Sequence, residues 1–169
     1  NDFLEYLIPD PTERDYFVQW LSAKAQDVTF KGAAILMVAP TQGTGRTTLT
    51  DMITQLFQHG NVRKVNFPTL CGATDNGAFN DWQESVMVTC DEVMTGDKSK
   101  YKVYEGLKDL FDPKPKETLI NTKYGSQRKT TLYTSYILLT NHSDAIGALG
   151  DDRRVYTIQN TVTRQSPEY

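Results

Sequence analysis

The chain has 169 residues, of which 38% are apolar and 23% charged, as expected for one ordinary globular domain. A net charge of −3 excludes a strongly basic nucleic-acid coat protein, so any nucleic-acid contact must rest on a few local cations. Two cysteines and two histidines provide neither a disulfide framework nor a plausible zinc cluster. The longest apolar run, 33–40, is far shorter than the ~20 residues of a membrane span.

The first segment, residues 1–32, is predicted to be helical. Asp10 is placed to cap a helix that starts at Pro11, and Glu13 is the third residue of a capping box. Four side chains form one apolar face at helical spacing: Tyr16, Phe17, Trp20 and Leu21. We expect this face to pack in the core or against a subunit rather than to bind a ligand.

A wholly apolar run over residues 33–38 predicts a strand buried on both faces. The polar loop 40–45 follows, and apolar spacing then predicts a helix over 46–59, with Gly60 as its stop. A strand, a glycine-bearing loop and a helix form the arrangement that binds phosphate, because the loop amides and the helix N-terminus face the anion.

The loop matches the phosphate-loop pattern G-x-x-x-x-G-K-[ST] in part. Gly45 and Thr47 match, whereas Pro40 replaces the first glycine and Arg46 replaces the lysine. Arginine keeps the charge but is longer and planar, which is compatible with nucleotide binding and unfavourable for hydrolysis. The expected phosphate-binding residues are Gly43, Thr44, Gly45, Arg46, Thr47 and Thr48. The alternative is a plain strand–turn–helix connection with glycines for geometry.

Two further strands are predicted over 62–66 and 86–90, and the second ends at Asp91 and Glu92. In phosphate-loop enzymes the strand-end aspartate holds Mg²⁺ beside the loop threonine, here Thr47, and a neighbouring glutamate is placed to polarise the attacking water. A solvated strand end is the alternative interpretation.

A helix is predicted up to Phe111, before Asp112-Pro113. The segments 118–124 and 129–133 flank Gly125-Ser126-Gln127 and predict a hairpin.

The apolar run 135–140 predicts a strand that ends at Asn141, and a last strand is predicted over 154–158. An amide at a strand's carboxyl end faces the ligand crevice of an open α/β sheet, where Asn141 could orient water or contact a γ-phosphate. A simple turn over 141–144 is the alternative. Because strands alternate with helices, we expect an α/β fold with a mostly parallel sheet.

The sequence Asp151-Asp152-Arg153-Arg154 follows the predicted Asn141 strand. Arginine suits recognition of phosphate charge, including as a finger supplied by a neighbouring subunit. The alternative is a surface ion pair between Asp152 and an adjacent arginine, which contributes little energy.

In this order, the elements resemble a superfamily 3 helicase of the AAA+ class, specifically the helicase module of phage and viral primase-helicases. The resemblance spans about residues 8–156 and rests most on 138–142 and 151–154. The stretches Phe79-Asn80-Asp81-Trp82 and 8–16 are also similar.

The resemblance implies three parts: an N-terminal helical segment over 1–32, a P-loop ATPase core over 33–160, and a C-terminal tail over 161–169. The core would hold a mostly parallel sheet flanked by helices and a β-hairpin before the sensor strand.

The family also implies roles for matching residues, with ATP and Mg²⁺ as cofactors. The Walker A end would be Gly45, Arg46 and Thr47. Asp91 would be the Mg²⁺ ligand and Glu92 the activator of water. Asn141 would be the sensor amide and Arg153 the finger that acts in trans, with Arg154 as the fallback.

In this family the pre-sensor hairpin enters a central pore and grips single-stranded DNA, and the matching segment is 118–133. Its cations Lys123, Arg128 and Lys129 lie beside Tyr124, which suits tracking of the DNA backbone with base stacking. A hairpin whose charges only aid solubility is the alternative.

The leading expectation is an ATP-dependent DNA helicase or translocase of phage or viral replication, which works as a homo-oligomeric ring. The ring would be a hexamer in the full-length parent, with a primase-polymerase domain in the same chain. Arg46 motivates an alternative, a hydrolysis-impaired nucleotide-binding module that assembles or loads a replication complex. A small-molecule kinase is a third possibility, which the Arg cluster after the sensor strand disfavours.

Because the first residue is Asn1 rather than methionine, we expect a piece of a longer protein. We expect no membrane partner and a cytoplasmic location, in the host cell if a phage encodes the protein.

Overall fold

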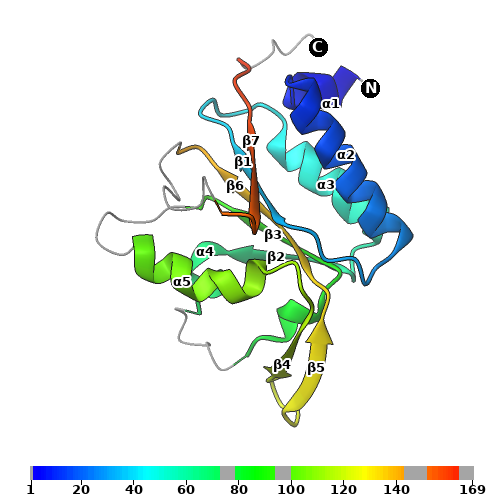
Figure 1. The fold of residues 1–169 in the computed structure, drawn as a ribbon, viewed down its shortest axis with the longest axis vertical. Coiled ribbons are helices and arrows are strands. Elements are labelled where there is room, and N and C mark those ends of the chain that lie inside the picture. The colour runs from blue at the N-terminus through cyan, green and yellow to red at the C-terminus, as the bar shows by residue number, and fades with distance from the viewer. Residues whose placement is uncertain (1, 73–78, 94–99, 143–151, 164–169) are drawn as a thin grey trace.

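The computed structural model describes residues 2–72, 79–93, 100–142 and 152–163. Its main sheet consists of β1 (Ala34–Val38), β2 (Val62–Asn66), β3 (Met87–Asp91), β6 (Ser135–Thr140) and β7 (Val155–Gln159). The strand order is β2-β3-β6-β1-β7, and every neighbouring pair is parallel (Figure 1). The predicted α/β fold with a mostly parallel sheet is confirmed.

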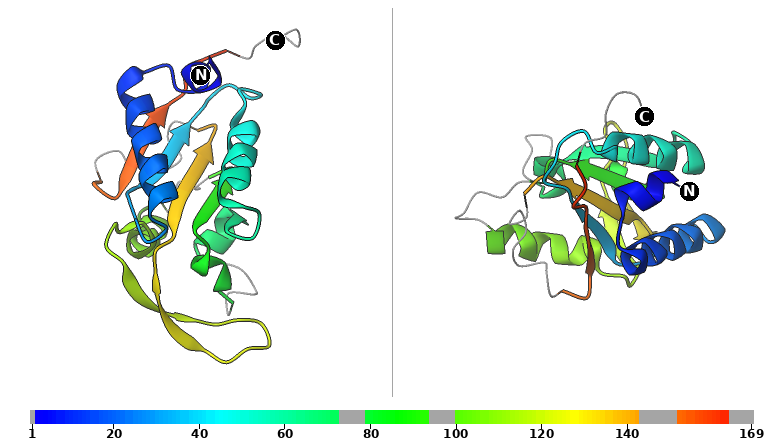
Figure 2. Two further views of the ribbon diagram at one scale, coloured as in Figure 1. Left: turned by 90° about the vertical axis from the view of Figure 1, so that its right-hand side faces the viewer. Right: turned by 90° about the horizontal axis from the view of Figure 1, so that it is seen from above.

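Helices cover both faces of this sheet (Figures 1 and 2). They are α1 (Asp2–Leu7), α2 (Pro11–Gln26), α3 (Arg46–Phe57), α4 (Phe67–Leu70) and α5 (Lys100–Phe111), with a short 3₁₀ helix η1 (Asp81–Glu84). The first three helices pack on one face, and α4 and α5 pack on the other. Among the described residues, no helix has the length and apolar character needed to cross a bilayer.

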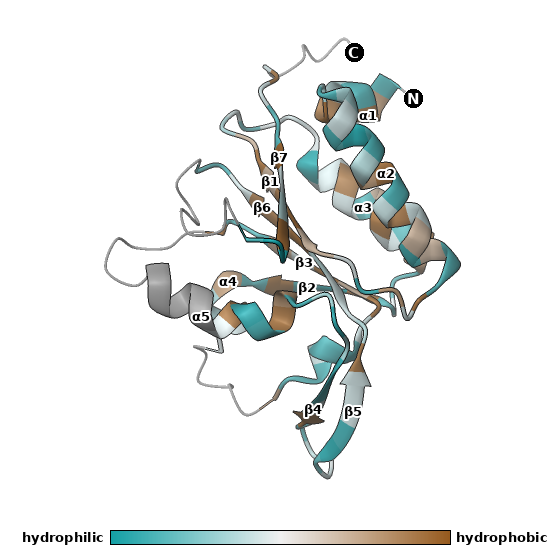
Figure 3. Ribbon diagram, in the orientation of Figure 1, coloured by the Kyte–Doolittle hydropathy of each residue, from teal (hydrophilic) through white to brown (hydrophobic). Residues whose placement is uncertain are grey.

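The strand β1 shows why the sheet residues are apolar without alternation. Its residues Ile35 and Met37 join the core beneath α1–α3, whereas Ala34, Leu36 and Val38 join the core beneath α4 and α5. All five are buried, as a parallel strand covered on both faces requires. Figure 3 shows the apolar residues concentrated in the middle of the sheet and a hydrophilic hairpin tip.

The N-terminal segment is helical over α1 and α2, but the prediction of helix over 27–32 is wrong. Lys24 is completely buried, and its Nζ donates to the carbonyl oxygens of Val28, Phe30 and Tyr133 at 2.7, 2.8 and 2.6 Å. A continuing helix would direct the first two carbonyls along its own axis. The ammonium therefore replaces the helix as their hydrogen-bond donor and links α2 to the chain before β6.

Asp10 caps α2 as predicted, because its side chain accepts from the amides of Thr12 and Glu13 at 2.8 and 2.9 Å. The expected capping box is not completed. The Glu13 carboxylate instead accepts from the amide of Gln159, 2.9 Å away at the end of β7. A bond to the neighbouring strand thus takes the place of the local one.

The apolar face of α2 lies in the core. Phe17 and Trp20 are buried, and Tyr16 stacks on Tyr156 of β7 with 3.7 Å between ring centroids. The helix α3 ends at Phe57 rather than at His59, because Gln58 adopts a left-handed φ of 69°.

The predicted hairpin is confirmed as the antiparallel strands β4 (Lys116–Ile120) and β5 (Arg128–Leu132), which project from the sheet (Figure 1). Its loop is longer than predicted and covers 121–127. Asn121 leaves the ladder because its amide donates to Asn80 Oδ1 at 2.7 Å and its carbonyl accepts from the Asn80 amide at 3.0 Å.

Candidate functional site

Three strands bring their carboxyl ends to one edge of the sheet. The loop 39–45 follows β1, Glu92 follows β3, and Asn141 follows β6. Two backbone hydrogen bonds hold the segments that follow these strands together. The amide of Ala39 donates to Thr140 O (2.9 Å), and the amide of Val93 donates to Leu139 O (3.1 Å). We call this region the carboxyl edge.

The loop after β1 has the backbone of an anion site. Gly43 and Gly45 adopt φ values of 75° and 92°, which favour glycine. The helix α3 starts at Arg46, and its first internal bond is from the amide of Leu49 to Gly45 O, at 3.0 Å. The three preceding amides therefore lack partners within the helix and are available to an anion, together with the helix dipole.

The ring of Phe3 lies against this loop. A Cβ added at Gly45 would stand 2.9 Å from Phe3 Cε2, so the close approach as well as the positive φ requires glycine there. This contact could not be predicted from the sequence, because no local pattern links α1 to the loop.

Arg46 and Asn141 meet directly. The guanidinium donates to Asn141 Oδ1, although 95 positions separate the two residues. Burial lowers the pKa of Arg46 from its ordinary value, and the negative charges of Asp91 and Glu92 oppose that shift. The structure therefore brings together four predicted site residues at the carboxyl edge.

Asp91 pairs through Oδ2 with Lys64 of β2, which sequence reasoning missed. Its other oxygen, Oδ1, is buried and has no hydrogen-bond partner among the described residues. An unpaired buried carboxylate oxygen suits a hard cation. No group of three or more His, Cys, Asp or Glu that could hold a metal occurs in the described parts of the chain. A cation here would need phosphate oxygens and water as further ligands, as is usual for Mg²⁺.

Glu92 is exposed and has a left-handed φ of 57°, an uncommon conformation for a residue with a side chain. The next residue, Val93, is buried, and its carbonyl accepts from Thr140 Oγ1 at 2.9 Å. The chain is thus turned sharply directly after β3, which places a carboxylate in solvent at the carboxyl edge.

The predicted arginines lie elsewhere. They precede β7 and so stand at the amino edge of the sheet, away from the loop after β1. Arg154 pairs with Asp152 (3.1 Å) and Asp112 (3.5 Å), so the ion pair considered as the alternative exists, but it is partly buried rather than at the surface. Arg153 is exposed. Asp151 lies outside the described residues.

The predicted DNA-binding cations share the hairpin. Lys123 Nζ lies 5.1 Å from the ring centroid of Tyr124, which is 95% exposed at the tip with a φ of 64°. Arg128 is paired with Glu84 of η1, so its charge is partly compensated, whereas Lys129 is exposed. The hairpin precedes β6 and therefore extends from the amino edge, opposite the loop after β1 (Figure 1).

Comparison with known families gives one match. The sequence model described as "Family of unknown function (DUF5906)" matches residues 37–154. No curated protein matches the chain.

Several solved structures share the fold. The apo NrS-1 C-terminal region is 22% identical, with a TM-score of 0.82, and the match covers 99% of this chain and 39% of that one. Its A form gives 19% identity, a TM-score of 0.74, and coverage of 99% and 38%. A ligand-bound JCV helicase is 14% identical, with a TM-score of 0.55, and the match covers 95% of this chain and 44% of that one. At such identities the likeness is one of fold, and this chain spans about two fifths of the NrS-1 region.

Proposed function

We propose that this chain, which belongs to the family of unknown function DUF5906, is the nucleotide-binding motor domain of a DNA helicase or translocase. One observation carries the proposal: Arg46, Asp91, Glu92 and Asn141 gather beside a glycine loop that leaves helix amides available to an anion. The helicase-like fold supports it.

In this proposal the triphosphate lies on the amides at the start of α3, with Gly43 and Gly45 giving the backbone its close approach. Thr47 and Asp91 would hold Mg²⁺, and the unpaired Asp91 Oδ1 fits that task. When bound, the ion would neutralise phosphate charge. Arg46 would supply a second positive charge from the first residue of α3.

Glu92 would accept the proton of the attacking water as the water oxygen bonds to the γ-phosphorus. The bond from that phosphorus to the bridging oxygen breaks, and its electron pair leaves with ADP. Asn141 would orient the water or the γ-phosphate from the end of β6. Arg153, at the other edge of the sheet, would serve the site of a neighbouring copy rather than its own.

We propose single-stranded DNA and further copies of this chain as partners, in a ring that is hexameric in the full-length parent. A primase-polymerase domain in that parent, a role in phage or viral replication and a cytoplasmic location belong to the same proposal. Strand displacement by the full-length parent with ATP tests it, and absence of unwinding under ring-forming conditions would count heavily against it.

The hairpin yields a prediction of its own. Replacing Lys123 and Lys129 together with alanine should lower affinity for single-stranded DNA about tenfold at low salt and flatten its salt dependence, because each lysine neutralises a phosphate. Fluorescence anisotropy of a labelled oligothymidylate at two salt concentrations measures both effects. Arg63→Ala, an exposed cation on β2, should leave both unchanged. Unaltered binding by the double variant would exclude the hairpin as the element that binds single-stranded DNA.

A second candidate function is favoured by the Arg46–Asn141 hydrogen bond. This contact engages the two side chains that would meet the γ-phosphate, as expected of a module that binds nucleotide, hydrolyses it poorly, and assembles or loads a replication complex.

If that candidate is correct, Arg46→Lys should raise ATP turnover about tenfold, because a compact ammonium suits the β- and γ-phosphates better than a forked guanidinium. Phosphate release from both proteins measures this, with Asp91→Ala as background. A native chain that already turns over ATP at ordinary rates would leave the motor as the only candidate.

A further inference from the structure

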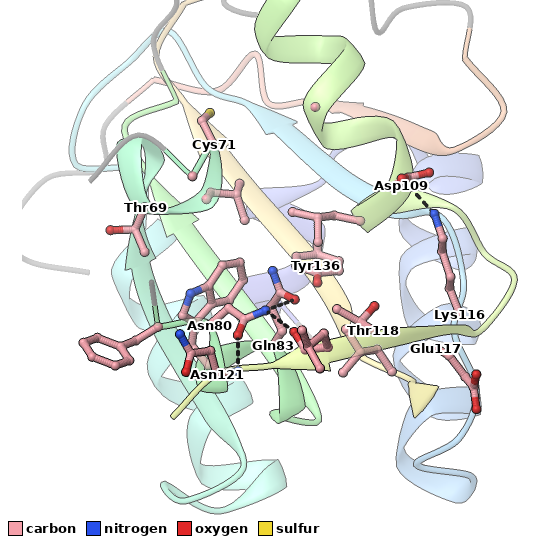
Figure 4. Close-up of a pocket in the computed structure, with 18 of the residues that line it drawn as sticks. Thr69, Cys71, Asn80, Gln83, Asp109, Lys116, Glu117, Thr118, Asn121 and Tyr136 are labelled. Carbon is pink, nitrogen blue, oxygen red and sulfur yellow. Dashed lines mark hydrogen bonds and ion pairs between the residues drawn. The ribbon is translucent and has the colours of Figure 1, made fainter. Parts of the chain in front are cut away.

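A cavity of about 670 Å³ lies between the hairpin, η1 and α5, and no residue of the carboxyl edge lines it. Figure 4 shows its two ends. The ion pair between Lys116 and Asp109 (2.8 Å) marks one end, Thr69 and Asn80 mark the other, and Tyr136 lies between them. The volume is in the range that holds a drug-sized molecule.

Lys31 lines this cavity and is only 8% exposed. Its ammonium makes no hydrogen bond or ion pair with any residue that the structure describes. Asp109 and Asp112 attract it from a distance, but they are paired with Lys116 and Arg154. A buried cation without a contacting anion is costly, so this lysine favours an anionic ligand.

Tyr136 contributes the second unpaired group. Only 2% of the residue is exposed, and its ring packs edge-on against Phe111, with 5.4 Å between centroids. Its hydroxyl points into the cavity between Gln83 and Thr118 and has no hydrogen-bond partner among the described residues (Figure 4). Burial raises the pKa of this phenol, so it remains a hydrogen-bond donor.

The opposite end of the cavity is aromatic and rich in amides. Trp82, two residues after Asn80, lines the cavity while packing on the core beneath α5. Asn80 is held in place by the hairpin, because its Nδ2 donates to Leu119 O at 3.1 Å and its Oδ1 accepts from Asn121. An aromatic side chain with amides beside it is the usual surface for an unstacked base.

We propose that this cavity binds one nucleotide unit, with the phosphate on Lys31 and the Tyr136 hydroxyl and the base beside Trp82. A free mononucleotide and one link of a single strand share this chemistry. The site goes beyond the proposed ATP site and does not depend on hydrolysis there.

The test uses the whole chain with two probes, thymidine 5′-monophosphate and a short labelled oligothymidylate. Lys31→Met and Tyr136→Phe should each weaken binding of the occupying probe about five- to tenfold, because each removes a donor to phosphate. Lys114→Met, an exposed lysine outside the cavity, should bind as the native chain does. Melting curves identify any variant that fails to fold.

A native cysteine gives a readout that needs no variant. Cys71 lines the cavity and is partly exposed, whereas Cys90 is completely buried, so a maleimide reports on this cavity alone. Burial raises the pKa of the Cys71 thiol to about 11, and the labelling is therefore done at mildly alkaline pH.

Slower labelling of Cys71 with the mononucleotide alone would identify a free nucleotide as the ligand. Slower labelling with the oligothymidylate alone would identify a strand. If neither probe slows the labelling, or if both variants bind as tightly as the native chain, the proposal is wrong. Binding of a fluorescent ATP analogue, measured in parallel, reports on the carboxyl edge and so separates failure of the proposed motor function from failure of this site.

Discussion

Replacing Asp91 with alanine should abolish the part of ATP binding that depends on magnesium, and so weaken binding about 100-fold when Mg²⁺ is saturating. The reason lies at the end of β3, where Asp91 Oδ1 is buried without a partner. No cluster of other metal-ligating side chains in the described residues could replace it. Any hydrolysis should fall by at least the same factor, because the phosphate charge would then be poorly neutralised.

Calorimetric titration with a non-hydrolysable ATP analogue, with and without Mg²⁺, measures the effect directly. Asp51→Ala is the matched control, since it removes an exposed carboxylate from α3 without touching the carboxyl edge. If Asp91→Ala kept the full magnesium enhancement, the ion would be held elsewhere and the proposed site would be wrong.

Lys64 supplies a companion variant of opposite sign. It pairs with Asp91, but the two side chains are 62% and 31% exposed, so the pair contributes at most ~1 kcal/mol. Lys64→Met should therefore lower the Mg²⁺ concentration needed for half-maximal ATP binding by up to about fivefold. Arg63→Met removes the same charge from the opposite face of β2 and should have no effect.

The strand β6 connects the hairpin to the carboxyl edge, the two regions to which the proposed function assigns DNA and nucleotide. It begins at Ser135, directly after the hairpin root, and ends next to Asn141 at the carboxyl edge. All six of its residues are buried, and it pairs with both β1 and β3. In the proposed motor, β6 is therefore the direct covalent link between Asn141 and the root of the hairpin.

The sheet could be predicted from the sequence because its strands have recognisable local patterns of apolar residues. The apolar run 33–38 and the largely apolar segment 135–140 fit strands covered on both faces, and the structure has strands at both places. The loop after β1 could be predicted as well, since its glycines and its position between a strand and a helix are local features. The gathering of Arg46 and Asn141 followed from the parallel sheet, although their direct hydrogen bond did not.

What escaped prediction depends on contacts between distant residues. Lys64 interrupts a short strand and gives no sign that it reaches Asp91 across the sheet. Phe3 contacts the loop after β1 only because α1 packs beside that loop. The hairpin loop widened because Asn80, far earlier in the chain, captures the backbone of Asn121. Such partners are selected by packing, which local propensity does not report.

Lys24 is the clearest example of a long-range contact that the sequence does not reveal, and its replacement is expected to have a large effect on stability. In sequence it is a charged residue near the end of an amphipathic helix, yet it is completely buried, with three carbonyl acceptors around its ammonium. Burial lowers the pKa of this ammonium to about 8, and the negative charge of Asp27 opposes that shift. Lys24→Met would keep the aliphatic stem and leave the carbonyls without this donor.

Because an unsatisfied buried acceptor costs 1–3 kcal/mol and the buried charge is relieved in exchange, we expect Lys24→Met to lower the free energy of unfolding by about 3 kcal/mol. For a chain of this size that corresponds to a melting temperature about 6–12 °C lower. Urea unfolding followed by circular dichroism measures it, with Lys114→Met as the exposed control that should change stability by less than about 0.5 kcal/mol. Equal stability of the native chain and Lys24→Met would mean that the link between α2 and the root of β6 holds without the ammonium.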